Sequence, residues 1–457
     1  MRGIFVFASA FGFVRRSLRV PLLTYPARAM PTLSPFRPLR FNPEFFSNLG
    51  LLISPPYDVI GPALREQLAE QAPFNIVRLI LPAGSQPYAE ASQLLADWKQ
   101  SGVVVQDPQE AIYPYRQTFT HPQTNQRIVR TGFMATLRLA PFSAGEILPH
   151  ERTLSGPKQD RLRLMLATHA NLEPIFGIYA DPAGATTAVL NAATKQELPT
   201  IDAMDSEGIR HEVWQMTEAE TIQQLKTHLQ GNPAFIVDGH HRYETALRYQ
   251  ELAREGSNEP IGALPCDWIM IFLAPMNDPG LLILPTHRLV HSLPTFNFGQ
   301  VLEQLREDFL VTTPVAPADG LALLQQHESR PSYLLSDGNV CAVVVAKDSE
   351  TATRLTSPEN PAAVRSLDVS LLHDHLFERL LGITQQQQLE QTNLRYVKNA
   401  TEALAAPGTN GVQLAVLMNP TRLEQVVEVA TSGGVMPQKS TFFYPKLASG
   451  LLMNPLG

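Results

Sequence analysis

Apolar residues at positions 235–237 lead directly into the sequence Asp-Gly-His-His-Arg at positions 238–242. The next thirteen residues contain no glycine or proline until Gly256, which is typical of a helix. The pattern predicts a β-strand, a tight turn at residues 238–239 and a helix that begins near His240. The start of a helix presents unpaired main-chain N–H groups and the positive end of the helix dipole, and both attract anions. The junction therefore predicts an anion site between a strand and a helix.

Side chains at this turn favour phosphate as the anion. Gly239 allows a close approach of the main chain to a ligand because it has no side chain. His240, His241 and Arg242 add imidazole and guanidinium groups, which are suitable donors to phosphate oxygens. Two other interpretations stay open, an ordinary turn with solvated histidines and a zinc site. Zinc is disfavoured because adjacent histidines point in different directions on a helix.

Residues 238–246, Asp-Gly-His-His-Arg-Tyr-Glu-Thr-Ala, resemble the phosphate-binding motif of the ParB/sulfiredoxin superfamily, whose members bind nucleotides through a similar turn. Within that superfamily the motif is most similar to that of the free L-serine kinases, which also carry an upstream Pro-His-Glu. This chain has Pro149-His150-Glu151. The resemblance implies that Glu151 is the catalytic base, and we assign His240 to the catalytic group with it. The resemblance to the free L-serine kinases is limited to the two motifs and their order, because the motifs lie much further apart here than in the small kinases.

Nearly everything after residue 34 resembles a bacterial and archaeal family known as domain of unknown function ten-fifteen. The matching stretches include Arg-Pro-Leu-Arg at 37–40, Pro-Pro-Tyr-Asp-Val-Ile at 55–60, Leu-Pro-Thr-His-Arg at 284–288 and Pro-Gln-Lys-Ser-Thr at 437–441. This resemblance implies little about function, apart from a helix-turn-helix regulator.

Glu151 follows Pro149, which fixes a loop or the start of a helix. Two roles for Glu151 are open. It stabilises the dipole of the following helix, or it takes a proton from a substrate hydroxyl that attacks phosphorus. Lys158 and Arg161 follow within a few turns and are predicted substrate contacts, with ion pairing on the helix surface as the alternative.

Further positions complete the candidate site. Asp58, in a stiff Pro-Pro-Tyr-Asp loop, either caps a helix or binds a substrate amine. His287 and Arg288 end a predicted strand, where ligands gather in α/β sheets, and are predicted substrate and anion contacts, with a structural turn as the alternative. Residues 439–441, Lys-Ser-Thr, resemble a polar anchor for phosphate. Asp238 is the predicted protein ligand of Mg²⁺, which the phosphates of ATP or ADP would otherwise hold.

Strands and helices alternate along the chain, which predicts an α+β fold with a mixed α/β sheet. The motif resemblance implies a ParB/sulfiredoxin-like core with flanking modules. The expected division is a disordered extension or mis-assigned start at 1–30, an N-terminal α/β module at 31–145, the phosphate-binding core at 146–295 and a C-terminal α/β module at 296–457.

Individual elements can also be predicted. Residues 112–119 and 128–139 alternate like two antiparallel strands joined by a polar turn. The apolar residues of 75–81 predict another strand. His373 and His375 are two positions apart on a predicted helix and therefore on different faces, which favours a surface role for both.

Composition limits the class of partner. A net charge of −7 argues against a general nucleic-acid coat, which needs a basic surface. Two cysteines, Cys266 and Cys341, are too few for a disulfide scaffold, and are typical of core residues in a reducing cytoplasm. The apolar stretch at residues 4–14 is too short to span a bilayer, although a helix that touches a membrane there is an alternative to disorder. Neither a membrane nor a nucleic acid is an expected partner.

These features predict a nucleotide-dependent kinase of a small hydroxyl metabolite, with Mg²⁺ and ATP or ADP as cofactors. Residues 238–242 would hold the donor phosphates and Glu151 would orient the attacking hydroxyl. The resemblance makes free L-serine the preferred acceptor. Two alternatives remain. One is a nucleotide-binding, DNA-associated regulator of the helix-turn-helix type without catalysis, and the other is a phosphoesterase or nuclease, which needs more clustered carboxylates than this sequence has.

Overall fold

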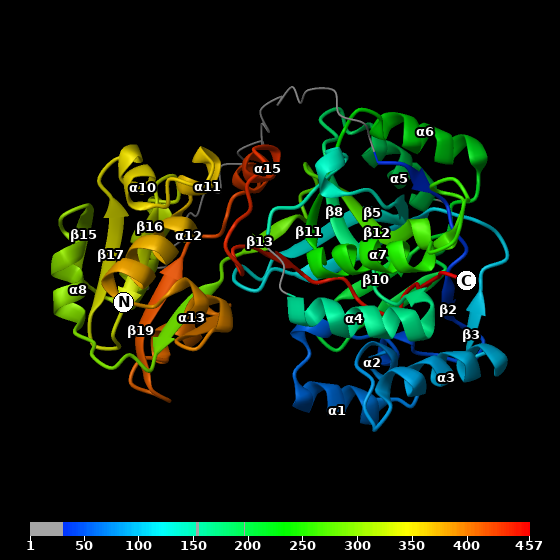
Figure 1. Cartoon of the computed structure of the whole chain (residues 1–457), viewed down its shortest axis with the longest axis horizontal. Coiled ribbons are helices and arrows are strands. Elements are labelled where there is room, and N and C mark those ends of the chain that lie inside the picture. The colour runs from blue at the N-terminus through cyan, green and yellow to red at the C-terminus, as the bar shows by residue number, and fades with distance from the viewer. Residues whose placement is uncertain (1–30, 152–154, 196) are drawn as a thin grey trace, which may run out of the picture.

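The computed structural model describes residues 31–151, 155–195 and 197–457. Two bodies of strands and helices lie side by side in Figure 1, the larger on a nine-stranded sheet and the smaller on a six-stranded sheet. The larger sheet contains both parallel and antiparallel neighbours, so the prediction of a mixed α/β sheet is confirmed. The predicted extension at residues 1–30 falls outside the described residues.

The larger sheet places the phosphate-motif strand between two neighbours. Strand β11 pairs in parallel with β6 and antiparallel with β8, and its five residues are all buried. The predicted hairpin at residues 112–139 is confirmed as β4 and β5. The order across the sheet is β6 (Ile147–Leu148), β11 (Ala234–Asp238), β8 (Ile175–Tyr179), β12 (Trp268–Pro275), β5 (Arg127–Arg138), β4 (Tyr113–Thr120), β10 (Arg210–Val213) and β9 (Ile201–Met204), with β1 (Leu33–Ser34) paired to β5.

Helices cover this sheet, and two of them carry the sequence motifs. Helix α4 (Ser155–Thr168) follows the Pro-His-Glu motif and packs against α7 (His240–Ala253), which follows the phosphate motif. Other helices and strands of the larger body are α5 (Ala185–Lys195), α6 (Ala219–Leu229), α1 (Pro62–Gln71), α2 (Val77–Ile80), α3 (Pro87–Gln100), β2 (Leu39–Phe41) and β3 (Val104–Gln106). Because residues 77–80 form α2, the prediction of a strand at 75–81 is wrong.

The smaller body surrounds a six-stranded sheet. Its strands, in order, are β15 (Phe309–Val315), β17 (Cys341–Ala346), β16 (Ser332–Ser336), β19 (Val412–Met418), β14 (His287–His291) and β18 (Leu394–Val397). Its helices are α8 (Phe298–Leu305), α9 (Pro317–Gln326), α10 (Ser349–Leu355), α11 (Ala362–Arg365), α12 (Asp368–Leu371), the π-helix η5 (Leu372–Leu380), α13 (Gln385–Glu390), α14 (Ala400–Ala405) and α15 (Leu423–Thr431).

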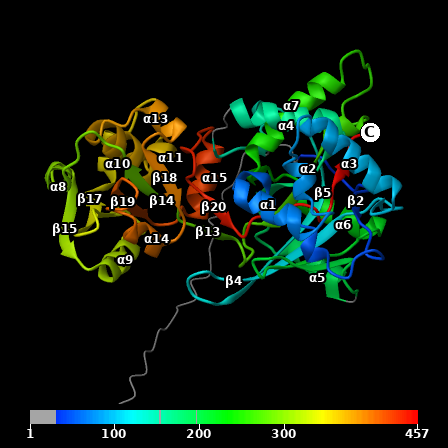
Figure 2. The ribbon, with the colours of Figure 1, turned by 90° about the horizontal axis from the view of Figure 1, so that it is seen from below.

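Two structures join the bodies. Strand β13 (Leu282–Leu284), which leaves the larger body, pairs with the returning strand β20 (Phe442–Tyr444), and Figure 2 shows both between the bodies. Helix α15 contributes Val426 and Val429 to the core of the smaller body, and Val427 and Ala430 to that of the larger one. The interface therefore combines main-chain pairing with apolar packing.

After β20 the chain ends in the larger body, where β21 (Asn454–Pro455) pairs with β7 (Ala170–Asn171). The larger sheet takes strands from both sides of residue 145, and the two large sheets divide between β13 and β14. The four-part division at residues 30, 145 and 295 stays a prediction about folding units.

Cys266 and Cys341 are free and buried, as a role in the core requires. Within residues 31–151, 155–195 and 197–457, no helix has the length and apolar character needed to cross a membrane.

Candidate functional site

The strand, turn and helix predicted around residues 235–247 are present as β11, Gly239 and α7. Gly239 precedes the helix with φ of 83°, in the left-handed region that favours glycine. A Cβ atom at this position would lie 2.9 Å from Nε of Arg242. No side chain caps the helix, so its first turn depends on other partners for its N–H groups. The glycine is therefore required both by the turn and by the close approach of Arg242.

Asp238 is held between two cations at the end of β11. Nη2 of Arg242 donates to Oδ2 over 2.6 Å, and the ammonium of Lys446 donates to Oδ1. Burial alone would raise the pKa of Asp238, but the charges of Lys446 and Arg242 hold it well below its usual range. Arg242 also donates to the carbonyl of Pro174. Arg242 thus supports the turn from inside, and its predicted contact with phosphate stays a prediction.

The Pro-His-Glu motif meets the phosphate motif through two histidines. The main-chain N–H of His150 donates to Nε2 of His240 over 3.4 Å, and the two rings form an edge-to-face pair with centroids 4.8 Å apart. Nδ1 of His150 lies 2.9 Å from the carbonyl of Ile236, so it carries the proton, and Nε2 accepts from the hydroxyl of Thr441 over 2.8 Å. Both rings are neutral because burial lowers their pKa values, that of His150 to about 4.

Glu151 lies beside the segment of residues 436–441, which we call the return segment because it leads back into the larger body. The N–H of Lys439 donates to Oε1 of Glu151 over 3.1 Å, and the N–H of Met436 donates to the carbonyl of His150 over 2.7 Å. Lys439 has φ of 57°, a conformation that costs a non-glycine residue about 1 kcal/mol. Burial raises the pKa of Glu151, although the N–H and charge of Lys439 oppose the shift.

The return segment also contains residues 439–441, whose sequence resembles a phosphate anchor. The structure places them at the two motifs, since Thr441 contacts His150 and Lys439 contacts Glu151. The role of these residues in binding phosphate stays a prediction.

Several predicted substrate residues of the larger body surround the motifs and already have protein partners. Lys158 forms a 2.5 Å ion pair with Glu244 of α7. Arg161 is buried, donates to the carbonyl of Ile80 over 2.5 Å and lies over the ring of Tyr57. Their roles as substrate contacts stay predictions.

Asp58 and His241 lie at the outer part of the same region. Asp58 is exposed and His241 is half-buried. Burial lowers the pKa of His241, and the charges of Glu244 and Lys158 act on it in opposite directions. Of the two motif histidines, His241 is therefore the one closer to solvent.

His287 and Arg288 approach the site from the smaller body. Nη2 of Arg288 donates to the carbonyl of Lys439 over 3.2 Å, and its guanidinium lies 5.5 Å from the ring of Tyr396. Nδ1 of His287 accepts from the N–H of Met418 over 3.3 Å, and burial lowers the pKa of His287 to about 4. Both side chains are buried, and Arg288 supports the return segment through its bond to Lys439.

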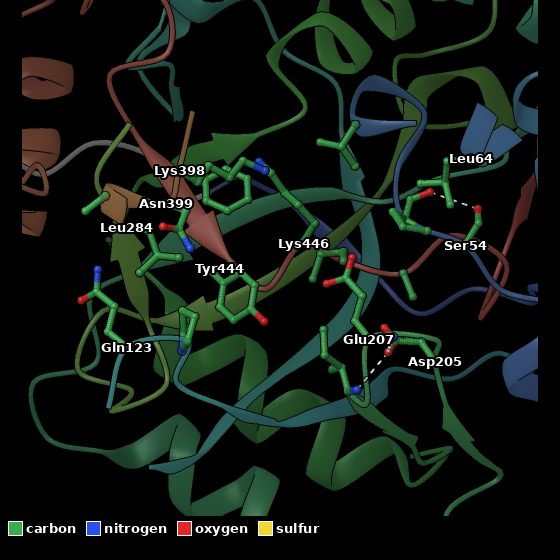
Figure 3. A pocket seen from close by; sticks show the side chains of 18 of the residues that line it. Ser54, Leu64, Gln123, Asp205, Glu207, Leu284, Lys398, Asn399, Tyr444 and Lys446 are labelled. Carbon is green, nitrogen blue, oxygen red and sulfur yellow. Dashed lines mark hydrogen bonds between the residues drawn. The ribbon is translucent and has the colours of Figure 1, made fainter. Parts of the chain in front are cut away.

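A cavity of about 530 Å³ opens on the other side of Lys446. Figure 3 shows Lys398, Lys446, Tyr444 and Glu207 around it. Both ammonium groups lie over the ring of Phe442, that of Lys398 at 3.5 Å and that of Lys446 at 5.0 Å. Partial desolvation, followed by the charge of Lys446, lowers the pKa of Lys398 to about 8. Two cations and an aromatic ring thus converge in a space large enough for a small molecule.

Sequence reasoning did not find Lys398 or Lys446. Lys446 follows Tyr444 and Pro445 near the C-terminus, and Lys398 comes directly after β18, so neither belongs to a motif. No local pattern predicted that residues 442–444 would return to the phosphate motif.

Asp238, the residue predicted to bind Mg²⁺, is already engaged by two cationic side chains. Both oxygens of Asp238 accept from cationic side chains, which leaves no free oxygen for Mg²⁺ at the residue predicted to bind it. In the part of the chain that the structure describes, no three or more histidine, cysteine, aspartate or glutamate side chains gather as a metal site.

The fold and this site define a mixed α/β protein with buried, charge-paired motifs at the junction of a strand and a helix. The chain belongs to the family described as "Protein of unknown function (DUF1015)", whose model matches residues 33–370. None of the curated proteins matches the sequence significantly.

Similar solved structures include a mutant free serine kinase in complex with ADP, with 12% identity and a TM-score of 0.33 over 65% of this chain and 84% of that chain. A conserved hypothetical protein from Pyrococcus furiosus has 13% identity and a TM-score of 0.31 over 66% and 90%. SbnI with a C-terminal truncation, from Staphylococcus aureus, has 11% identity and a TM-score of 0.32 over 70% and 87%.

Proposed function

We propose that this protein is a nucleotide-dependent phosphotransferase, which transfers a phosphoryl group from ATP or ADP to the hydroxyl of a free amino acid, with L-serine as the preferred acceptor. The proposal includes a ParB/sulfiredoxin-like core. The observation that carries it is the contact between His150 and His240. This contact brings the candidate base, Glu151, next to a helix start suited to phosphate, although the two motifs are far apart in sequence.

The donor site is assigned to the start of α7 and to the cavity beyond Lys446. The first turn of α7 offers main-chain N–H groups and the positive end of the helix dipole to phosphate oxygens. Lys446 lies between Asp238 and the cavity, and Lys398 faces the same space. A polyphosphate there is stabilised by two ammonium groups, while Phe442 offers an apolar surface to the rest of the nucleotide.

Glu151 acts as the general base in this mechanism. Its carboxylate accepts the proton of the acceptor hydroxyl while the hydroxyl oxygen forms a bond to the terminal phosphorus. The bond between that phosphorus and the bridging oxygen breaks, and its electron pair leaves with ADP or AMP. A raised pKa favours this role because a stronger base takes the proton more readily at neutral pH. The N–H of Lys439 orients the carboxylate.

Magnesium is part of the predicted chemistry, but Asp238 as it stands does not fit a role as its ligand. A magnesium ion bound to Asp238 requires that Lys446 or Arg242 first release an oxygen. The mechanism above therefore assigns no step to the ion, and the charge on the phosphates is balanced by protein cations.

Nucleotide binding is the first test. Thermal shift with ADP, ATP and CTP, with and without Mg²⁺, should raise the unfolding temperature for at least one adenine nucleotide. Release of ADP or AMP is then measured with L-serine, threonine, homoserine and glycerate. Hydroxyl-dependent release supports the kinase. Clear nucleotide binding without release for any acceptor contradicts it, and a mobility shift on DNA would then support the regulator.

A further inference from the structure

The smaller body contains a second cavity, of about 230 Å³, which we call the η5 cavity because the π-helix η5 forms one wall. The loop at residues 357–360 and helix α13 form other walls, and residues 435, 437 and 438 close it. The described residues that line it include Glu359 and Asp374 but no lysine or arginine. The larger cavity differs from it, because Lys398 and Lys446 line that cavity together with Asp205 and Glu207.

Two buried polar groups of this wall lack hydrogen-bond partners among the described residues. They are Oγ of Ser370, at 2% exposure, and Nε2 of His373, at 8%. Leaving such a group unpaired costs about 1–3 kcal/mol, so a ligand that pairs with it recovers that energy. The sequence predicted His373 and His375 at the surface, and this prediction is wrong because both are buried.

The hydrogen bonds of Gln388 fix the proton position on His373. The amide nitrogen of Gln388 donates to the carbonyl of Ile383 over 2.9 Å and to that of His373 over 3.3 Å. Its amide oxygen therefore points to Nδ1 of His373, 2.6 Å away, and Nδ1 carries the hydrogen. Burial also keeps the ring neutral, since it lowers the pKa of His373 to about 3. Nε2 is consequently an acceptor that requires a donor from the ligand.

The backbone here is unusual as well. Residues 372–380 form a π-helix, a geometry that is rare and occurs frequently at functional sites. Ser370 lies in the turn just before it and His373 in its first turn. Ser370 and His373, which carry the two unpaired atoms, thus both line one cavity.

We propose that the η5 cavity binds a small amine. An ammonium group donates to Nε2 of His373 and is balanced by the carboxylate of Asp374, which is half-buried and forms no ion pair among the described residues. The hydroxyl of Ser370 bonds a second polar group of the ligand. The volume suits a compound of a few non-hydrogen atoms, since drug-sized ligands occupy about 300–1,000 Å³.

The η5 cavity and the site around Glu151 share the return segment. Pro437 and Gln438 line the η5 cavity, and the next residue, Lys439, donates to Glu151. A bound amine therefore lies against the return segment. The assignment of the amine site itself does not depend on the proposed kinase activity.

Isothermal titration of the full chain with ethanolamine and putrescine tests the proposal, with glycerol and acetate as uncharged and anionic controls. We expect both amines to bind and neither control to do so. Asp374→Asn and His373→Phe should each weaken amine binding at least about tenfold, because each removes a charge-assisted partner. Asp319→Asn, an exposed acid on α9 of the same body, is the matched control and should bind amines like the wild type.

Three results would overturn the proposal. The first is that the wild type binds neither amine, which would mean that the cavity holds only water. The second is that glycerol binds as tightly as the amines. The third is that both cavity variants keep the amine affinity of the wild type. Near-UV circular dichroism verifies that each variant is folded. If His373→Phe does not fold, the amine affinity of Asp374→Asn tests the proposal alone. Asparagine has the shape of aspartate and still accepts a hydrogen bond from the N–H of Ser357.

Discussion

The N–H of Lys439 donates a 3.1 Å hydrogen bond to Oε1 of Glu151, although the two residues are 288 positions apart in the sequence. Lys439 belongs to the return segment, which the chain forms after completing the smaller body. The orientation of the candidate base therefore depends on both bodies. A change in their relative position would move the N–H of Lys439 and release the carboxylate, so the proposed catalysis would require the assembled chain.

Glu151→Gln should separate catalysis from nucleotide binding. Glutamine keeps the size and one oxygen acceptor for the N–H of Lys439, but it cannot take a proton at neutral pH. We expect turnover to fall about 100-fold or more while the dissociation constant for ADP stays near the wild-type value. Product release and thermal shift measure the two quantities. Glu428→Gln, exposed on α15, is the control, and an unchanged turnover in Glu151→Gln would remove Glu151 from the mechanism.

The two motif histidines should differ in their effect on nucleotide affinity. His240 is buried at the start of α7, and because its Nε2 accepts from His150, its Nδ1 is the donor of the neutral ring. Loss of this donor in His240→Ala should weaken nucleotide binding about tenfold, the value of one good hydrogen bond. His241→Ala should have a smaller effect because its ring lies nearer to solvent. Titration calorimetry with ADP compares them, and a larger loss in His241→Ala would reverse the assignment.

Arg242→Ala should destabilise the fold as well as the site. Its guanidinium is buried and bonds Asp238 and the carbonyl of Pro174, so its removal leaves buried acceptors without a partner. Loss of one member of a buried ion pair costs about 3–5 kcal/mol. Arg248→Ala, in the exposed part of the same helix, removes an ion pair with Glu251 and should cost less than about 1 kcal/mol. Urea unfolding measures both, and equal losses would contradict the structural role of Arg242.

The sequence predicted an element correctly where residues close together in the chain determine its structure. The junction at 234–253 was predicted because Asp-Gly breaks an apolar strand and the next residues favour a helix. Residues 75–81 were predicted wrongly because a short buried apolar run does not distinguish a strand from a helix. Oδ1 of Asn75 accepts from the N–H of Val77, and its amide donates to the carbonyls of Leu51 and Ile53. These tertiary bonds start a helix that no period in the sequence indicates.

In the candidate site, too, local sequence predicted some residues and not others. Order along the chain identified both motifs, and the contact of His150 with His240 joins them. Lys446 and Lys398 were not predicted because the contact of Lys446 with Asp238, and its proximity to Lys398, arise from the return of the chain through β20. Such contacts depend on topology, which a single sequence does not reveal by spacing.

Stability should fall as the pH decreases from about 6.5 to about 4, because buried neutral histidines must gain protons on unfolding. The pKa values of His150 and His287 are lowered to about 4 in the fold, below their usual value of 6.5. The unfolded chain therefore binds more protons in this window, and the stability present above it is lost as the pH falls. Each group contributes about 2 kcal/mol of loss by about pH 5.

His287→Gln tests this expectation, since glutamine keeps an acceptor for the N–H of Met418 but does not titrate. The free energy of unfolding in urea, measured at about pH 7 and about pH 5, should fall by about 2 kcal/mol less in this variant than in the wild type. His228→Gln, on the exposed face of α6, should fall as much as the wild type. An identical fall in His287→Gln would mean that His287 is protonated in the folded state at about pH 5, and its role as a buried, neutral acceptor for Met418 would then be wrong.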